Sequence, residues 1–312
     1  MKIALLYAAW DGEGWSTPIG FRNELESRGH EIQHYNLYHD DGRINPRDRI
    51  RHYSADCLNK LMRDYSMQGY RPDVVYVMDY GQFDTPAQDK KFFPDTTWIM
   101  EAGDEPQTFN MNVNKARKFH GVLTPDKMCA DAYGKMGIQA KWHTHHADHR
   151  LFYPRPEITE EFDCITTCGP RGAGLTEKIA EALGDRFSNH RYYYGEKHAE
   201  RLNMGKMVFQ CSQYKEVTRR IFEGMACGKM AITDRLDEST GLADLFTDGV
   251  DIVYYSNAEE AIEKIRYYAE HDDERLRIAQ AGYQKVMQNH TVASRVDQFE
   301  EFAIELTQPT IA

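Results

Sequence analysis

Short apolar segments alternate along the chain with segments whose apolar residues recur at helical spacing. We expect strands at residues 2–8, 31–37, 73–78, 97–100, 121–124 and 140–143, and again at 162–167, 191–194, 207–211, 230–233 and 251–254. The helical patterns cover residues 18–28, 54–67, 109–118, 127–136, 273–288 and 291–306, and the capping-box spacing of Ser256 and Glu259 predicts one more helix. Strands joined through helices form parallel sheets with helices on both faces. The alternation therefore predicts an α/β fold built from doubly wound, Rossmann-like sheets.

The length of the chain favours two domains of this kind. A single hydrophobic core reaches its limit at about 300 residues, and the chain has 312. The segment Pro154–Pro156 resists helix formation and precedes a new strand, so it predicts a boundary. We therefore expect an amino-terminal domain over residues 1–154, a carboxyl-terminal domain over 155–290, and a terminal helix within 291–312 that crosses back to the first domain.

The composition excludes several classes of protein. With 49 acidic and 38 basic side chains the formal charge is −11, which argues against a protein that coats nucleic acid or membranes nonspecifically. The apolar runs fall short of the roughly 20 residues that a membrane span needs. The six cysteines have no paired CxxC spacing, so we expect reduced thiols and a cytoplasmic protein.

The strongest local constellation lies between two predicted strands, at residues 217–229. Thr218, Arg219 and Arg220 fall at the expected start of a helix, and Glu223 follows Arg219 by one turn. A helix start with a hydroxyl and an arginine suits a diphosphate, and a carboxylate one turn later suits the hydroxyls of a ribose. The spacing alone fits an ordinary surface ion pair between residues four apart just as well.

The same segment carries a family pattern. Arg220-x-Phe-Glu-x-x-Ala-Cys-Gly228, followed by an apolar strand and by Leu245-Phe-x-x-Gly249, resembles the nucleotide-sugar domain of GT-B glycosyltransferases. Within that group it resembles the CgeB-type branch, the spore-maturation-protein-B-like enzymes. The resemblance extends to residues 14–22, to the segment Ala147–Pro154, and to His290, Thr291 and Arg295.

This resemblance implies two Rossmann-like domains facing across a cleft, with the acceptor on the first domain and the nucleotide-sugar donor on the second. It implies a hexosyl- or pentosyltransferase that moves a sugar to an acceptor hydroxyl without a metal ion or other cofactor. Arg219 and Arg220 would then hold the diphosphate, Glu223 the ribose, and Ser212 would line the donor pocket. Further donor-binding candidates are Thr218, Gly169, Arg171, Tyr194 and His146.

An inverting enzyme also needs a general base for the acceptor hydroxyl. Asp104, and after it Glu101, follow a predicted strand of the first domain, from which a carboxylate can reach the cleft. A solvated acidic turn is the alternative. Many retaining relatives carry two glutamates separated by seven residues, whereas the partner position after Glu223 is Ala231. The resemblance therefore leaves open whether the reaction retains or inverts.

The acceptor site is predicted in two segments of the first domain. Trp15, Ser16 and Thr17 belong to the loop after the first strand, and Arg47 and Arg51 belong to a basic run in an otherwise acidic chain. Such a run attracts anions, so the acceptor could be an anionic glycan, a protein, or DNA with a hydroxymethylated base. A solvated loop is the alternative for the run.

Two further hypotheses concern metal and activity. The histidine cluster at residues 143–149 suggests zinc, but no second ligand cluster at standard spacing accompanies it, so we expect no metal. A donor contact by His145 or His146 is the better functional hypothesis, and an ordinary packed or solvated histidine is the alternative. An epimerase or hydrolase on the same fold would consume donor without an acceptor. A non-catalytic nucleotide-sugar-binding protein is the third possibility, and Ala231 motivates it.

Overall fold

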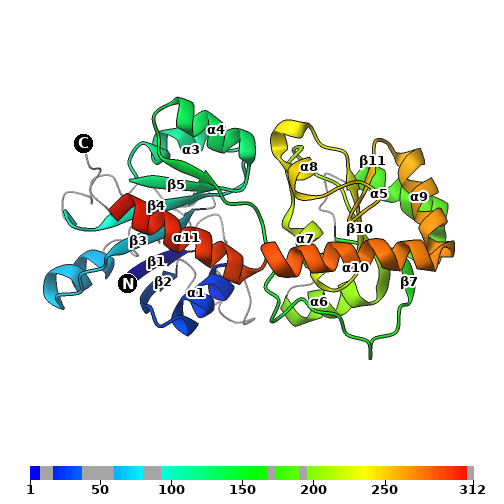
Figure 1. Ribbon diagram of the computed structural model, residues 1–312, viewed down its shortest axis with the longest axis horizontal. Coiled ribbons are helices and arrows are strands. Elements are labelled where there is room, and N and C mark those ends of the chain that lie inside the picture. Colours follow the sequence, from blue (N-terminus) through cyan, green and yellow to red (C-terminus); the bar gives the residue numbers. More distant parts are fainter. Residues whose placement is uncertain (8–16, 37–59, 80–92, 168–172, 190–194, 308–312) are drawn as a thin grey trace. The chain divides into compact units, whose positions relative to one another are not determined.

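The computed structural model describes residues 1–7, 17–36, 60–79, 93–167, 173–189 and 195–307 (Figure 1). The chain forms two compact units, one of residues 1–144 with 295–312 and the other of residues 145–294. The division follows Thr144 and precedes the expected boundary at Pro154. Its cause is local pairing within the second unit, because Ala147 N donates to His290 O and Val292 N donates to Ala147 O, each at 3.0 Å.

The first unit contains a parallel six-stranded sheet in the order β2-β1-β3-β4-β5-β6. Its strands are β1 (Lys2–Tyr7), β2 (Glu31–Asn36), β3 (Val74–Asp79), β4 (Thr97–Ala102), β5 (Gly121–Thr124) and β6 (Ala140–Trp142). Its helices are α1 (Thr17–Ser27), residues 60–67, α3 (Phe109–Ala116), α4 (Lys127–Lys135) and most of α11 (Val292–Thr307). The side chains from Ile3 to Tyr7 are fully buried, which is typical of a parallel strand covered on both faces.

Helix α11 completes the first unit by packing on its sheet. Phe299 lies against Phe21 of α1 and Tyr76 of β3, with ring centroids 5.6 and 4.5 Å apart. A Cβ on Gly121 of β5 would lie 2.6 Å from the ring of Phe302. Only glycine therefore permits this close approach of helix and strand.

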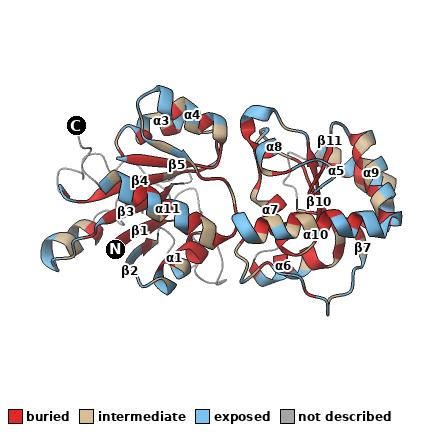
Figure 2. Cartoon of the chain, viewed as in Figure 1, coloured by how far each residue is buried: buried red, intermediate tan, exposed pale blue. Residues whose placement is uncertain are grey.

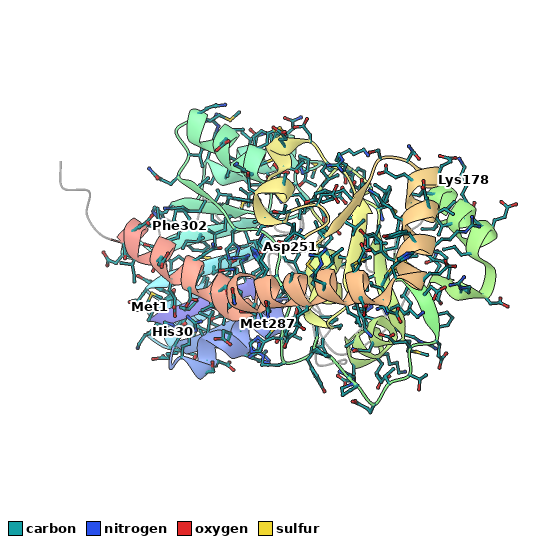
Figure 3. The ribbon with its side chains drawn as sticks, turned by 45° about the vertical axis from the view of Figure 1, so that its right-hand side comes forward. Met1, His30, Lys178, Asp251, Met287 and Phe302 are labelled. Carbon is teal, nitrogen blue, oxygen red and sulfur yellow. The ribbon has the colours of Figure 1, made fainter. Side chains whose placement is uncertain are left out.

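Charged groups add to the docking of α11. The amino group of Met1 lies 3.1 Å from Nδ1 of His30, and both residues are labelled in Figure 3. Nε2 of His30 lies 2.5 Å from a carboxylate oxygen of Glu300. Arg28 donates to Glu300 at 2.8 Å and to Asp297 at 2.6 Å. The start of the chain and its last helix thus share one set of ionic contacts.

The second unit contains a parallel five-stranded sheet in the order β11-β10-β9-β7-β8. Its strands are β7 (Phe162–Thr166), β8 (Phe187–Asn189), β9 (Gly205–Gln210), β10 (Met230–Asp234) and β11 (Val253–Tyr255). Its helices are α5 (Ala173–Leu183), α6 (Gly195–Asn203), α7 (Arg219–Ala226), α8 (Leu242–Leu245), α9 (Ala258–Glu270) and α10 (Asp272–Asn289). The strand expected at 191–194 lies outside the described residues, and β8 pairs with β7 just before it.

Buried residues follow the strands of both sheets (Figure 2). In the second unit, α7 approaches β9 so closely that a Cβ on Gly224 would lie 2.9 Å from Cβ of Val208. Because α7 follows β9 and runs back across the sheet, its first residues lie at the carboxyl edge of the strands. None of the described helices is long and apolar enough to cross a membrane.

The start of α9 corrects one sequence prediction. The N-cap is Asn257, not Ser256, because the Asn257 side chain accepts from Glu260 N at 2.9 Å. The Glu260 carboxylate in turn accepts from Ser256 N at 2.7 Å. The side-chain cap therefore lies one residue later than the sequence pattern indicated, and the return bond of Glu260 goes to the residue before the N-cap and not to the N-cap amide.

Candidate functional site

The carboxyl edge of the second sheet gathers polar groups from two neighbouring strands. Ser212 follows β9, and its backbone N and Oγ donate to the carboxylate of Asp234, the last residue of β10, at 2.9 and 2.5 Å. Asp234 is buried, and Nζ of the exposed Lys215 lies 3.5 Å from the same carboxylate. The predicted donor-pocket residue Ser212 is therefore held in place by an aspartate that the sequence analysis did not assign to the site.

The loop between Ser212 and α7 is tied down by its own side chain. The carboxylate of Glu216 accepts from Gln213 N at 3.2 Å and from Tyr214 N at 2.5 Å. Burial raises the pKa of Glu216, and the backbone amides of Glu216 and Gln213, together with the nearby Arg220, oppose the rise. These hydrogen bonds thus hold the loop in a defined conformation up to the start of α7.

The first turn of α7 presents groups suited to an anion. Thr218 is the N-cap residue and is only 7% exposed, and its Oγ1 has no hydrogen-bond partner among the described residues. Arg219 and Arg220 are half-buried in the first helical turn. A buried hydroxyl without a partner is costly unless a ligand or water uses it. A helix start with guanidinium groups attracts negative charge.

Glu223 lies one turn further along α7 and is 4% exposed. Its Oε1 lies 3.3 Å from Nε of Arg219, and its Oε2 lies 3.2 Å from Nε2 of His198. Burial alone would raise the pKa of Glu223, but His198, Arg219 and Arg220 lower it to about 2. The side chain is therefore a buried, ionised carboxylate. Each of its oxygens keeps a second lone pair that can accept from a hydroxyl.

His198 is a site residue that the sequence analysis missed. It lies on α6, is buried, and stacks edge-on against Phe152 with ring centroids 5.6 Å apart. The buried residues of α6 include Gly195, His198, Ala199 and Leu202, which is the spacing of one helix face. That periodicity was readable, but it does not indicate Glu223 as the partner, because 25 residues separate the two side chains.

In the first unit, the two predicted bases occupy different positions. Strand β4 continues through Ala102, so Glu101 lies within the strand and not in the turn that follows it. Its Oε2 accepts from Tyr76 OH at 3.0 Å. Asp104 lies in the turn, is exposed, and has a φ of 53°. Of the two, Asp104 is the one beyond the carboxyl end of β4.

Beside Asp104 lies a buried network that the sequence analysis also missed. Glu105 is 3% exposed, and its Oε1 accepts from Asn112 Nδ2 at 3.0 Å and from Tyr133 OH at 2.5 Å. Its Oε2 accepts from the hydroxyl of Thr124. Burial raises the pKa of Glu105 more than these donors lower it. No sequence signal distinguishes Glu105 from Asp104, because both are acidic residues of one turn.

The other predicted site residues divide into two groups. Thr17 is the first residue of α1 and is half-buried, and His146 is buried in the segment that begins the second unit. The rest lie outside the described residues, namely Trp15, Ser16, Arg47, Arg51, Gly169, Arg171 and Tyr194. In the part of the chain that the structure describes, no three His, Cys, Asp or Glu side chains gather closely enough to hold a metal ion.

Comparison with known families decides the class of protein. A family model described as "Glycosyl transferase-like" matches residues 132–301, more than half of the chain. The chain belongs to this glycosyl transferase-like family. The match includes the segment from Ser212 to Glu223 and the whole of the second unit. No curated protein sequence matches the chain.

Solved structures agree with the family. Sucrose-phosphate synthase from Thermosynechococcus elongatus superposes with a TM-score of 0.74 at 12% identity, covering 98% of this chain and 99% of that one. A glycosyltransferase from Rickettsia africae gives 0.69 at 13% identity, with 99% of both chains covered. HepE of Anabaena, in complex with UDP-glucose, gives 0.68 at 13% identity, with 97% and 99% covered. The predicted pair of Rossmann-like domains in a GT-B architecture is thereby confirmed.

Proposed function

We propose that the protein transfers a sugar from a nucleoside-diphosphate sugar to an acceptor hydroxyl, with donor recognition centred on the first two turns of α7. The observation that carries the proposal is the ionised, buried carboxylate of Glu223, which lies about one turn after Thr218 and Arg219 on α7. The family membership supports the same conclusion. The proposal includes membership of the CgeB-type branch, which the sequence motifs around Arg220 and Gly228 support.

The charge distribution of α7 suits both the diphosphate and the ribose of a nucleoside diphosphate. Arg219, Arg220 and the helix N-terminus would stabilise the negative charge that develops on the departing diphosphate. Thr218 Oγ1, which lacks a partner among the described residues, would donate to a phosphate oxygen. Glu223 would accept from the ribose hydroxyls. The proposal assigns this charge stabilisation to protein groups and requires no metal ion.

UDP-glucose is the first donor to test. HepE of Anabaena has been solved with UDP and with UDP-glucose, and its fold covers nearly the whole of this chain. The donor-site predictions for Ser212, Gly169, Arg171, Tyr194 and His146 belong to this hypothesis. The part-buried contact between Ser212 and Asp234 supports a preformed wall at that edge of the sheet.

Asp104 is the proposed general base. It is an exposed carboxylate beyond the carboxyl end of β4, where a base can reach an acceptor hydroxyl. Glu101 is less suited because Tyr76 already donates to it within the sheet. The acceptor is proposed to be an anionic hydroxyl compound bound by the segments around Thr17 and around Arg47 and Arg51.

The reaction is proposed for a reducing compartment such as the cytoplasm. Cys129, Cys164, Cys211 and Cys227 are buried free thiols. Burial raises the pKa of Cys129 and Cys227, so these two thiols stay protonated at neutral pH. A protein that keeps such thiols free needs no oxidising environment.

The deciding experiment is a donor screen followed by turnover. Thermal stabilisation by UDP, GDP, CMP and ADP identifies the nucleotide, because a ligand of the native state raises its stability by about 3 kcal/mol at 100 times its Kd. Release of UDP from UDP-glucose is then measured with and without candidate acceptors. Acceptor-dependent release supports transfer. Release at the same rate without acceptor favours a hydrolase or epimerase, and binding without turnover favours a non-catalytic protein.

Replacement of Asp104 by Asn tests the base. We expect Asp104→Asn to bind UDP with unchanged affinity and to lose about 100-fold in turnover, since general-base catalysis contributes about 100- to 10,000-fold. The matched control is Glu101→Gln, which changes a carboxylate within β4. Normal turnover of Asp104→Asn would remove Asp104 from the mechanism.

A further inference from the structure

We propose that Glu105 is a positioning residue for Asp104, whose buried side chain holds the turn after β4 in the conformation that presents Asp104. The inference rests on the proposed role of Asp104 as the base. Glu105 itself is 3% exposed and its carboxyl oxygens accept from three protein donors, so the role assigned to it is to hold the turn and not to meet the acceptor.

The backbone conformation of Asp104 needs support from neighbouring groups. Its φ of 53° lies in the left-handed region, which residues with a Cβ adopt at an energetic cost. A residue keeps such a conformation only where the surrounding structure imposes it. The residues on either side of Asp104 make the hydrogen bonds that hold the turn.

On the amino-terminal side, the constraint is the carbonyl oxygen of Gly103. It accepts from Thr108 Oγ1 at 2.5 Å and from Asn112 Nδ2 at 3.3 Å. The carbonyl oxygen of Asp104 accepts from Thr108 N at 3.1 Å. These bonds tie the turn to the start of α3.

On the carboxyl-terminal side, the constraint is the side chain of Glu105. Its donors come from three elements, namely Asn112 on α3, Thr124 at the end of β5 and Tyr133 on α4. Asn112 Nδ2 contacts both Gly103 and Glu105, so one amide bridges the two sides of Asp104. Removal of the carboxyl group would leave all three donors without this acceptor and would free the turn.

The chemistry of the network specifies which substitutes can replace Glu105. All three donors are neutral, Tyr133 among them, and the other titratable groups that face the network are Asp126 and Cys129. Burial and the Asp126 carboxyl raise the pKa of Glu105, which favours the neutral acid. A glutamine has the same shape, can accept from Tyr133 and Asn112, and can donate to Thr124. A glutamine at position 105 should therefore keep these hydrogen bonds and the conformation of the turn, and an alanine should lose both.

A double-mutant cycle that measures Tm tests whether Glu105 holds the turn, and it needs no substrate. In the parent protein, Asp104→Gly should raise Tm by about 2 °C, because glycine adopts a positive φ without the Cβ cost. In the Glu105→Ala protein the turn can relax, so the same change should bring no increase. An equal increase in both backgrounds would overturn the proposal, whatever reaction the protein catalyses.

A kinetic cycle tests the consequence for the base, with UDP release from UDP-glucose as the readout. We expect Glu105→Ala to lower kcat about 100-fold at an unchanged KM for UDP-glucose, which is the cost of misplacing a catalytic group by about 1 Å. Glu105→Gln should restore kcat to within about twofold of the parent. In the Asp104→Asn background, Glu105→Ala should cause no further loss. The control Phe119→Leu alters the buried core near the opposite end of β5 and should lower Tm without changing kcat.

The outcomes separate the two hypotheses. If Asp104→Asn keeps normal turnover, the proposed base is wrong, and the stability cycle alone decides whether Glu105 holds the turn. If Asp104→Asn loses turnover while Glu105→Ala keeps full kcat, Asp104 stands and the positioning role is overturned. Additive losses from the two substitutions would also overturn it, because Glu105 would then act independently of Asp104.

Discussion

Each unit of the protein buries a glutamate near the carboxyl edge of its parallel sheet, yet the two side chains are held in opposite ways. Glu223 in the second unit has its pKa lowered to about 2, against the effect of burial, by His198, Arg219 and Arg220. Glu105 in the first unit has its pKa raised, because burial outweighs the hydrogen bonds from three neutral donors. Burial is nearly the same, at 4% and 3% exposed. The partners therefore decide the direction in which the pKa shifts.

This difference indicates two different uses for a buried acid. An ionised carboxylate accepts strongly from ligand hydroxyls and orients the arginine beside it. A neutral carboxyl group avoids the cost of burying a charge and can hold several elements together. Glu223 accordingly belongs to the proposed donor site, and Glu105 to the support of the proposed base.

The largest effect should come from removing the arginine beside Glu223. Arg219→Ala deletes one of the cations that keep Glu223 ionised and one proposed diphosphate contact. We expect UDP affinity to fall about 10- to 100-fold, since a hydrogen bond to a charged group contributes about 1.5–3 kcal/mol. Titration calorimetry with UDP measures the loss. Arg266→Ala, which removes an exposed arginine of α9, is the matched control; UDP binding unchanged by Arg219→Ala would contradict the donor site.

Acid titration should reveal the stabilising effect of ionised Glu223. Its folded pKa lies below the ordinary value of 4.5, so its contribution is present above pH 4.5 and is lost as pH falls toward 2. The parent should lose about 2 kcal/mol of this contribution by pH 3, relative to Glu223→Gln. Urea unfolding of the two proteins at pH 5 and pH 3 gives the difference. Parallel pH profiles would mean that Glu223 is not held ionised.

A smaller effect should follow from making the partners of Glu223 more like those of Glu105. His198→Gln replaces the imidazole with a neutral donor and keeps a side chain against Phe152. We expect the pKa of Glu223 to rise, because the hydrogen bond from His198 and its charge both lower it. UDP affinity should fall about threefold, well short of the loss in Arg219→Ala. Affinity lower than that of Arg219→Ala would instead give His198 the main role.

The smallest effect is expected for Glu105→Gln at acid pH. The raised pKa favours the neutral acid in the folded state, so its stabilising effect is present below pH 4.5 and is lost as pH rises through the folded pKa. At pH 4 the variant and the parent should differ by less than about 1 kcal/mol. As pH rises, the variant should become the more stable of the two. A variant that loses stability with rising pH, relative to the parent, would show that Glu105 is ionised in the folded protein.

The sequence predicted the elements of the fold better than their contacts. The strand expected at 121–124 coincides with β5, and the helix expected at 18–28 overlaps α1. These elements are local patterns of apolar residues, so neighbouring residues specify them. The start of α9 was one residue off, because Ser256 and Asn257 are both good caps and only the bond from Glu260 N distinguishes them.

The site shows the same division. Arg219 and Glu223 could be paired from the sequence, since four residues along a helix always bring two side chains together. His198 and Asp234 could not, because they come from other elements, 25 residues from Glu223 and 22 from Ser212. Their contacts exist only once α6, α7 and the strands have packed.

The sequence by itself determined the alternating α/β architecture, the family pattern around Glu223, and the acidic turn that contains Asp104 and Glu105. Only the tertiary structure decided which of those two acids is exposed and which is buried, and in which direction the pKa of each buried glutamate shifts. The physical reason is that a carboxyl group's protonation depends on burial and on the donors around it. Those donors are brought together by long-range packing, which no local pattern of residues specifies.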